Sequence, residues 1–275
     1  MKFTKMQGCG NDYVYINCFE EKVEDAPALA RKVSDRHFGI GADGLVLIKP
    51  SSRDDFTMEM YNADGSQGKM CGNAIRCVGK YVFDHRMTKK RELAVETLAG
   101  TKYLSLNVSG DKVSEVTVLM GVPVFEPEKI PVVAEGKSVV DMPVTVDGRK
   151  YRITAVSMGN PHAVIFVEDT KNFPIEKIGP LFERHEMFPE RVNTEFVKVL
   201  DRENISMRVW ERGSGETWAC GTGACASAVA SVINGYTDGK VTVHMLGGNL
   251  HIRYDGEGGQ VHMTGPAVEV FRGEL

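Results

Sequence analysis

Two stretches of this 275-residue chain share one pattern and lie 149 residues apart. NADGSQGKMCGNAIRC spans residues 62–77, and ERGSGETWACGTGACA begins at Glu211. Each has a glycine-rich approach, a Cys-Gly step and a run of small residues. The same spacing separates Cys71 from Cys220 and Asn11 from Asn160. Two copies of one unit are therefore predicted, each near the common domain size of about 100–150 residues.

Each copy is predicted to surround one cysteine-bearing helix with many strands. A first helix is expected from Ala26 to Phe38, beginning near Pro27 and ended by the glycines of GIGADG. LVLIKP and FTMEMYN have strand character, and the cysteine helix follows at Cys71. The second copy repeats this order, and Gly235 ends its cysteine helix. This composition predicts an α+β fold rather than a parallel wound sheet.

The domain boundary is expected at the proline-bearing stretch GVPVFEPEKIPVV. We expect a first domain over residues 1–118 and a second over residues 119–263. The last strand, residues 264–275, is expected to join the first domain.

Charge and hydropathy exclude several classes of partner. The chain has 33 Lys and Arg against 37 Asp and Glu, with no basic block, so a nucleic-acid partner is not expected. No apolar run approaches the ~18–20 residues of a membrane span. The N-terminal MKFTKMQGCGNDY lacks the features of a secretory signal, which predicts a cytoplasmic protein that binds a small molecule.

Cysteine placement indicates chemistry. Reduced thiols are expected in such a chain, and the six- and five-residue spacings of the cysteine pairs do not match zinc motifs, so no metal is predicted. Cys71 and Cys220 are each predicted at the first turn of a helix. Backbone N–H groups and the positive helix end favour a thiolate there. The other four cysteines are expected to be structural.

Two equivalent thiols over one ligand could invert a stereocentre without a cofactor. One thiolate would take a proton from one face of a carbon while the other thiol gives a proton to the opposite face. The peptide N–H groups at the two helix starts would bind a carboxylate on that carbon and stabilise the charge that develops as its proton leaves. These groups belong to Gly72, Asn73, Gly221 and Thr222.

Five motifs occur in order along the whole chain: GNDY, CGNAIRC, GNPHAV, ERGxGETxACGTGACA and MTGPA. With these motifs the chain resembles the diaminopimelate epimerases. The resemblance implies two pseudo-symmetric domains, each a mixed, largely antiparallel sheet or barrel wrapped around a central helix. It implies cofactor-independent interconversion of LL- and meso-diaminopimelate in lysine and peptidoglycan precursor biosynthesis. Cys71 and Cys220 match the family's acid/base pair. A homodimer is compatible with it.

The resemblance also implies substrate ligands. Glu211 and Arg212 replace Asn62 and Ala63 at the repeat spacing, and they offer a carboxylate for an ammonium group and a guanidinium for a carboxylate. His162 matches a histidine that tunes one thiol. Four asparagines match the family's amide ligands: Asn11, Asn62, Asn160 and Asn193. Some members have Gln where this chain has Gly44, so no ligand is expected from Gly44.

Two alternatives use the same cysteines. Proline and hydroxyproline racemases share the resemblance, but a substrate with one carboxylate and one ring nitrogen has little use for the Glu211–Arg212 pair. A redox or zinc-binding protein is the alternative from another functional class.

Overall fold

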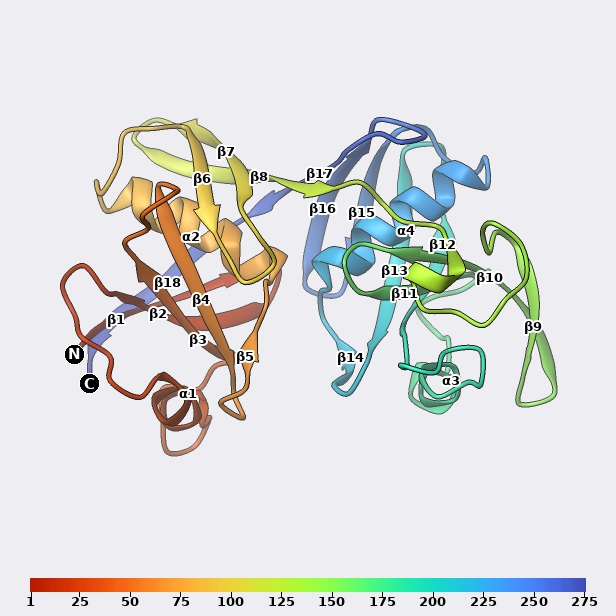
Figure 1. Cartoon of the computed structure of the whole chain (residues 1–275), viewed down its shortest axis with the longest axis horizontal. Coiled ribbons are helices and arrows are strands. Elements are labelled where there is room, and N and C mark those ends of the chain that lie inside the picture. The colour runs from red at the N-terminus through yellow and green to blue at the C-terminus, as the bar shows by residue number, and fades with distance from the viewer. The chain divides into compact units, whose positions relative to one another are not determined.

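The structure is a computed structural model that describes residues 1–275. Contacts between Cα atoms divide the chain into unit 1, which comprises Met1–Leu119 and Thr264–Leu275, and unit 2, which comprises Met120–Met263. The chain leaves unit 1 in strand β8 (Lys112–Gly121) and returns to it in strand β17 (Val261–Pro266) (Figure 1). None of the helices combines the length and the apolar character that a membrane crossing requires.

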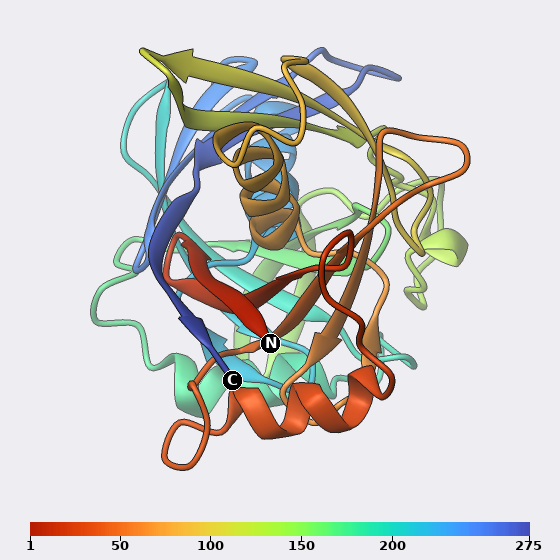
Figure 2. The same ribbon diagram turned by 90° about the vertical axis from the view of Figure 1, so that its left-hand side faces the viewer.

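Unit 1 is a mixed sheet whose strands surround helix α2 (Gly72–Asp84) (Figure 2). Most neighbouring strands are antiparallel, but β2 with β3 and β4 with β6 are parallel. The last strand of the chain, β18 (Val268–Glu274), pairs with β1. The other strands of the unit are β1 (Lys2–Gly8), β2 (Asn11–Asn17), β3 (Gly44–Lys49), β4 (Phe56–Asn62), β5 (Gln67–Gly68), β6 (Glu92–Glu96) and β7 (Lys102–Ser109).

Helix α1 (Ala26–Ser34) covers the apolar side of β2 and β3. Its start is capped by Asp25, whose side chain accepts a hydrogen bond from the N–H of Ala28. The helix ends four residues before the predicted Phe38, so that expectation is wrong at this end. The Asp35 carboxylate accepts hydrogen bonds from the N–H groups of His37 and Phe38, and this turn ends the helix.

From residue 149 onward, unit 2 (Met120–Met263) has the same order of strands and helices as unit 1. Antiparallel pairs again dominate, while β11 with β12 and β13 with β15 are parallel. Its strands are β9 (Met142–Val146), β10 (Arg149–Ser157), β11 (Pro161–Phe166), β12 (Asn193–Val199), β13 (Asn204–Glu211), β14 (Gly215–Thr217), β15 (Lys240–Met245) and β16 (Gly248–Tyr254). Its helices are the short 3-10 helix η1 (Pro127–Lys129), α3 (Ile175–Glu183) and α4 (Gly221–Ile233).

The repeat extends to the pairing of the strands. Helices α3 and α4 start and end 149 residues after α1 and α2. Tyr13 pairs with Gly44 in unit 1, and His162 pairs with Asn193 in unit 2, so both partners keep this spacing. After the cysteine helix the spacing falls to 148, because Val95 of β6 corresponds to Val243 of β15. The connection after α4 is therefore one residue shorter than the connection after α2.

Helix α4 is enclosed on all sides. Every residue from Gly223 to Ser231 is buried, and the side chains there are small: Ala, Ser, Val and Cys. A helix without a polar face is typical of the centre of a domain, and small side chains allow strands to approach it closely. The sheet therefore fixes the position of the helix start, where Cys220 lies.

Candidate functional site

Cys71 and Cys220 both occupy the N-cap of the central helix in their unit. Their backbones are extended, with φ −134° and ψ 124° at Cys71 and φ −124° and ψ 112° at Cys220. Cys220 Sγ accepts a hydrogen bond from the N–H of Gly223 at 3.4 Å, whereas the Cys71 side chain makes no capping hydrogen bond to α2. The two cysteines thus share a backbone position but differ in their surroundings.

In unit 1, the side-chain amide of Asn11 contacts Cys71. Asn11 is the first residue of β2, and its Oδ1 accepts hydrogen bonds from Cys71 Sγ and from Asn73 Nδ2, each at 3.4 Å. Its Nδ2 donates to Asp43 Oδ2 at 2.7 Å. Three of the predicted site residues, Asn11, Cys71 and Asn73, therefore lie together at the start of α2.

The other two predicted site residues of unit 1 are Gly72 and Asn62. Gly72 is the buried first residue of α2. Asn62 ends β4 with an exposed side chain, whose Nδ2 donates to Ser66 Oγ at 2.9 Å. Asn62 thus lies at the start of the glycine-rich loop that leads to Cys71.

Tyr13 also belongs to this site, although it was not predicted. Its ring is buried, and its hydroxyl lies close to Asn11 and Cys71. Burial, followed by the negative charges of Cys71 and Asp43, raises the pKa of the Tyr13 phenol well above its usual value. The phenol therefore stays protonated at neutral pH and can donate a hydrogen bond to a thiolate.

In unit 2, Asn160 is linked to Cys220 through Thr222. Asn160 Nδ2 donates to Thr222 Oγ1 at 3.2 Å, and Thr222 Oγ1 lies 3.5 Å from Cys220 Sγ. Thr222 and Gly221 are the first two residues of α4. The four predicted residues Asn160, Cys220, Gly221 and Thr222 therefore lie together at the start of α4.

His162 lies between two oxygen atoms in the interior of unit 2. The ring is fully buried, its Nδ1 is 2.7 Å from Glu195 Oε1, and its Nε2 is 3.0 Å from Asn160 Oδ1. Each ring nitrogen therefore has an oxygen atom as its hydrogen-bond partner. Glu195 is also fully buried, and a Cβ on Gly223 would lie 2.7 Å from its Oε1. The glycine thus allows this carboxylate to lie against the start of α4.

Glu211 and Arg212 do not pair with each other. The Glu211 carboxylate accepts a hydrogen bond from the Thr217 hydroxyl at 2.5 Å and lies close to the Cys220 thiol. Burial raises the pKa of Glu211, although Thr217 and Cys220 oppose the shift. The exposed Arg212 side chain donates from Nη1 to the backbone oxygen of Glu190 at 2.9 Å and forms no ion pair. Glu211 therefore faces a thiol, while Arg212 remains a cation available to an anion.

Asn193 uses both ends of its amide on the backbone. Its Nδ2 donates to the oxygen of Pro161 at 3.0 Å, and its Oδ1 accepts from the N–H of Arg212 at 2.9 Å. Because the side chain is buried, these bonds fix the strand ends from which Arg212 and His162 extend.

The pKa of Cys220 is raised well above its usual value, contrary to the effect expected at a helix start. Burial is the largest cause, and the negative charges of Glu211 and Glu195 follow. Hydrogen bonds from Thr222 and from the N–H of Gly223 lower the pKa, but they do not outweigh the burial. Cys220 is thus a thiol at neutral pH.

The residues that were not predicted carry recognisable signals in the sequence. Tyr13 stands at the repeat position of His162, and Glu195 is a charged residue between the apolar-facing positions of the strand NTEFVKV, whose first five residues are buried. Asp43 immediately precedes the buried strand β3. Each signal indicates a polar group next to a core, although none indicates which partner it meets.

No group of three or more His, Cys, Asp or Glu side chains in the chain is placed to hold a metal ion.

Comparison with known proteins gives one family. The family model described as diaminopimelate epimerase matches residues 3–126 and 154–270. A diaminopimelate epimerase of Acetivibrio thermocellus is 59% identical over 275 residues, which cover 100% of this chain and 98% of that protein. A diaminopimelate epimerase of Agathobacter rectalis is 58% identical over 282 aligned residues, with 100% and 99% coverage.

The fold is also similar to solved structures of low sequence identity. A probable proline racemase from Agrobacterium radiobacter superposes with a TM-score of 0.74 at 13% identity, covering 100% of this chain and 92% of that one. At this identity the likeness concerns the fold alone, and it agrees with the α+β architecture of two similar units.

Proposed function

The chain belongs to the diaminopimelate epimerase family, and on this premise we propose that it interconverts LL- and meso-diaminopimelate. The observation that carries the mechanism is the equivalence of Cys71 and Cys220, each at the N-cap of a central helix. We propose that the two thiols act as an acid/base pair at one α-carbon and that the reaction needs no cofactor.

In the proposed reaction the Cα–H bond breaks as one cysteine thiolate takes the proton. The electron pair passes into the adjacent carboxylate, and a new C–H bond forms on the opposite face with the proton of the other thiol. The cysteine that began as a thiolate ends as a thiol, and its partner ends as a thiolate. The reverse reaction therefore starts from the state in which the forward reaction finishes.

The helix starts supply the groups that hold the reacting carboxylate. The N–H groups of Gly72, Asn73, Gly221 and Thr222 belong to the first turns of α2 and α4. Such groups favour an anion, and they stabilise most strongly the charge that grows on the carboxylate as the α-proton leaves.

The second amino-acid group of the substrate needs a cation and polar oxygens. We propose that Arg212 binds the distant carboxylate, since its guanidinium has no carboxylate partner in the chain. Asn11, Asn62 and Asn160 are proposed as amide ligands. Asn193 is proposed to place Arg212 by holding its backbone N–H.

Glu211 and His162 are proposed to act on Cys220. The charge of Glu211 and the burial of the site raise the pKa of Cys220, which favours the thiol form. Cys220 would then carry its proton before substrate binds. His162 is proposed to hold Asn160 and Glu195 in place through its two ring nitrogens.

The experiment that tests the function is turnover in deuterated water. Purified protein incubated with LL-diaminopimelate should form the meso isomer with deuterium at the inverted α-carbon, and proline should remain unchanged. Retention of the original hydrogen would exclude proton exchange with a thiol. Racemisation of proline would support the related racemase activity instead.

Variants test the cysteine pair separately. Cys71→Ser and Cys220→Ser should each lower kcat by about 100-fold or more, because a hydroxyl is a far weaker base than a thiolate. Cys18→Ser is the control, since Cys18 lies outside both helix starts and should keep full activity. Wild-type activity in Cys71→Ala or Cys220→Ala would contradict the mechanism.

We also propose a cytoplasmic role in lysine and peptidoglycan precursor synthesis, which the family membership supports. A homodimer is proposed on the same basis. Light scattering coupled to gel filtration measures the mass of the assembly, and a mass near the 30.3 kDa of one chain would contradict the dimer.

A further inference from the structure

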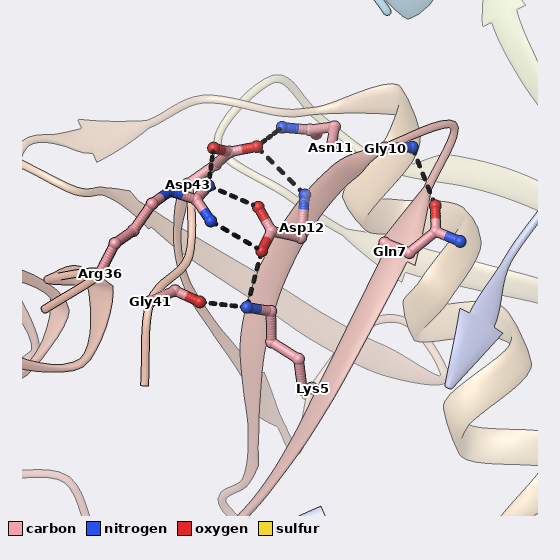
Figure 3. A network of polar contacts seen from close by, with 8 residues as sticks. All are labelled: Lys5, Gln7, Gly10, Asn11, Asp12, Arg36, Gly41 and Asp43. Carbon is pink, nitrogen blue, oxygen red and sulfur yellow. Dashed lines mark hydrogen bonds and ion pairs between the residues drawn. The ribbon is translucent and has the colours of Figure 1, made fainter. Parts of the chain in front are cut away.

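Asp43 is the centre of a polar network at the start of β2 (Figure 3). Its Oδ2 accepts hydrogen bonds from Asn11 Nδ2 at 2.7 Å and from the N–H of Asp12 at 3.1 Å. Its Oδ1 accepts from Arg36 Nη2 at 2.9 Å. Arg36 also pairs with Asp12, which in turn contacts the buried Lys5 at 2.6 Å. All three groups that face the Asp43 carboxylate are donors.

This carboxylate determines which end of the Asn11 amide faces Cys71. An ionised carboxylate can only accept hydrogen bonds, so the amide nitrogen must point to Asp43. The amide oxygen is then turned to the other side, where it lies 3.4 Å from both Cys71 Sγ and Asn73 Nδ2. A rotated amide would place its oxygen against the Asp43 carboxylate, which is electrostatically unfavourable.

The corresponding asparagine of unit 2 is held differently. The position of Asp43 is taken there by the buried Val192, which has no polar group. Asn160 instead directs its oxygen to His162 and its nitrogen to Thr222, the residue that contacts Cys220. The repeat alone therefore does not set the orientation of this amide, and each unit uses its own polar partner to set it.

We propose that Asp43 is a positioning residue that keeps the Asn11 carbonyl oxygen directed at the Cys71 thiol. In this orientation the Asn11 oxygen accepts a hydrogen bond from the Cys71 S–H group. This bond stabilises the protonated thiol and fixes the direction of its S–H bond. The orientation also prevents the Asn11 N–H groups from stabilising a Cys71 thiolate. The inference rests on the proposed acid/base role of Cys71. It adds Asp43 as the residue that determines which end of the Asn11 amide faces the thiol.

The test is the alkylation rate of Cys71 by iodoacetamide, followed by mass spectrometry of the two cysteine peptides. Alkylation requires the thiolate, so the rate at pH 7 reports its fraction without any need for turnover. In Asp43→Asn, the amide of Asn11 can rotate and donate to the thiolate. Cys71 should then react about fivefold faster, the ratio that one ordinary hydrogen bond supports. Cys220 of the same protein should react at its wild-type rate.

A double-mutant cycle separates this effect from the loss of a charge. In an Asn11→Ala background, Asp43→Asn should leave the Cys71 rate unchanged, whereas a purely electrostatic effect would persist there. Asp55→Asn is the matched control. Asp55 also accepts hydrogen bonds from a backbone N–H and a cationic side chain, but these belong to Ala94 and Lys90, outside the site. An unchanged or slower Cys71 rate in Asp43→Asn would overturn the inference.

A measurement on the unmodified chain covers the case in which the variant does not fold. Asn11 Nδ2 and the N–H of Asp12 point to the same oxygen of Asp43. A nuclear Overhauser spectrum of wild type should show a cross-peak between the Asn11 side-chain amide protons and the Asp12 amide proton. Cross-peaks to the Cys71 β-protons in its place would contradict the proposed orientation. Full activity of Cys71→Ala would instead remove the proposed function and leave these results intact.

Discussion

The ring of Tyr13 lies over Gly44: a Cβ on Gly44 would be 2.8 Å from Tyr13 Cε1. The same Cβ would be 2.1 Å from the backbone oxygen of Tyr61 on β4. The missing side chain at Gly44 thus allows β2, β3 and β4 to pack with the tyrosine ring directed at Cys71.

Gly44→Ala should therefore destabilise the protein. Backbone atoms of Tyr61 cannot move as a side chain does, so we expect the free energy of unfolding to fall by about 2 kcal/mol, as for other overpacked sites. Urea unfolding monitored by circular dichroism measures the change. Gly68→Ala is the control, because its Cβ would meet only the flexible Met60 side chain, at 3.0 Å. Equal losses in the two variants would contradict the explanation.

Tyr13→Phe should slow the alkylation of Cys71. The change keeps the ring over Gly44 but removes the hydroxyl that can donate to the thiolate. We expect the rate at pH 7 to fall about fivefold, the effect of one hydrogen bond. Tyr61→Phe is the control, since the hydroxyl of Tyr61 contacts Glu59 rather than a cysteine. A Cys71 rate that rises in Tyr13→Phe would show that the phenol does not support the thiolate.

Glu211→Gln should make Cys220 more reactive. The Glu211 charge contributes to the raised pKa of Cys220, so its removal lowers that pKa and raises the thiolate fraction at any pH below it. Alkylation of Cys220 at pH 8 should accelerate about tenfold, because the thiolate is the form that reacts. Glu203→Gln, an exposed change elsewhere in unit 2, should have no effect. The prediction fails if the pH profile of Cys220 alkylation is the same in Glu211→Gln and wild type.

Asp12→Asn should destabilise unit 1 in a pH-dependent manner. Burial alone would raise the pKa of Asp12, but hydrogen bonds from Arg36 and Lys5 hold it below its usual value. The ionised form therefore contributes stability that is present above the unfolded pKa of about 3.9 and is lost as the pH falls through the lower folded pKa. At pH 7 we expect a loss of about 3 kcal/mol, because the variant leaves Lys5 buried without its carboxylate.

Urea unfolding at several pH values checks this prediction. The difference between wild type and Asp12→Asn should be constant from pH 7 to pH 5 and should shrink below about pH 4. Adding Lys5→Met should recover part of the loss, since it removes the unpaired charge. A difference that grows on acidification would have the wrong sign for a carboxylate with a lowered pKa.

The sequence predicts the parts of the site that the repeat preserves. Cys71 and Cys220, and Asn11 and Asn160, share a spacing that follows from two equal sets of strands and helices. Patterns of apolar residues were sufficient to place the cysteine helices. The end of α1 was not predictable in this way, because a side-chain turn at Asp35 decides it.

The residues that tune the site are those that differ between the repeats. Asp43 corresponds to Val192, and Glu195 corresponds to Val46, so the repeat gives no indication of either carboxylate. Their partners come from neighbouring strands, and a single sequence does not specify which side chains meet across a parallel pair. The raised pKa of Cys220 also depends on such neighbours, since burial and two carboxylates outweigh the helix start.

Strand β18 has a consequence for the order in which the protein is made. Unit 2 is a continuous segment, but the sheet of unit 1 contains the last strand of the chain. Helix α2 depends on that returning segment, because Arg76 Nε donates to the backbone oxygen of Pro266 at 3.2 Å. Domains fold as units during synthesis. Unit 2 can therefore fold from one continuous segment, whereas unit 1 and the surroundings of α2 are completed only when the segment that follows unit 2 returns to them.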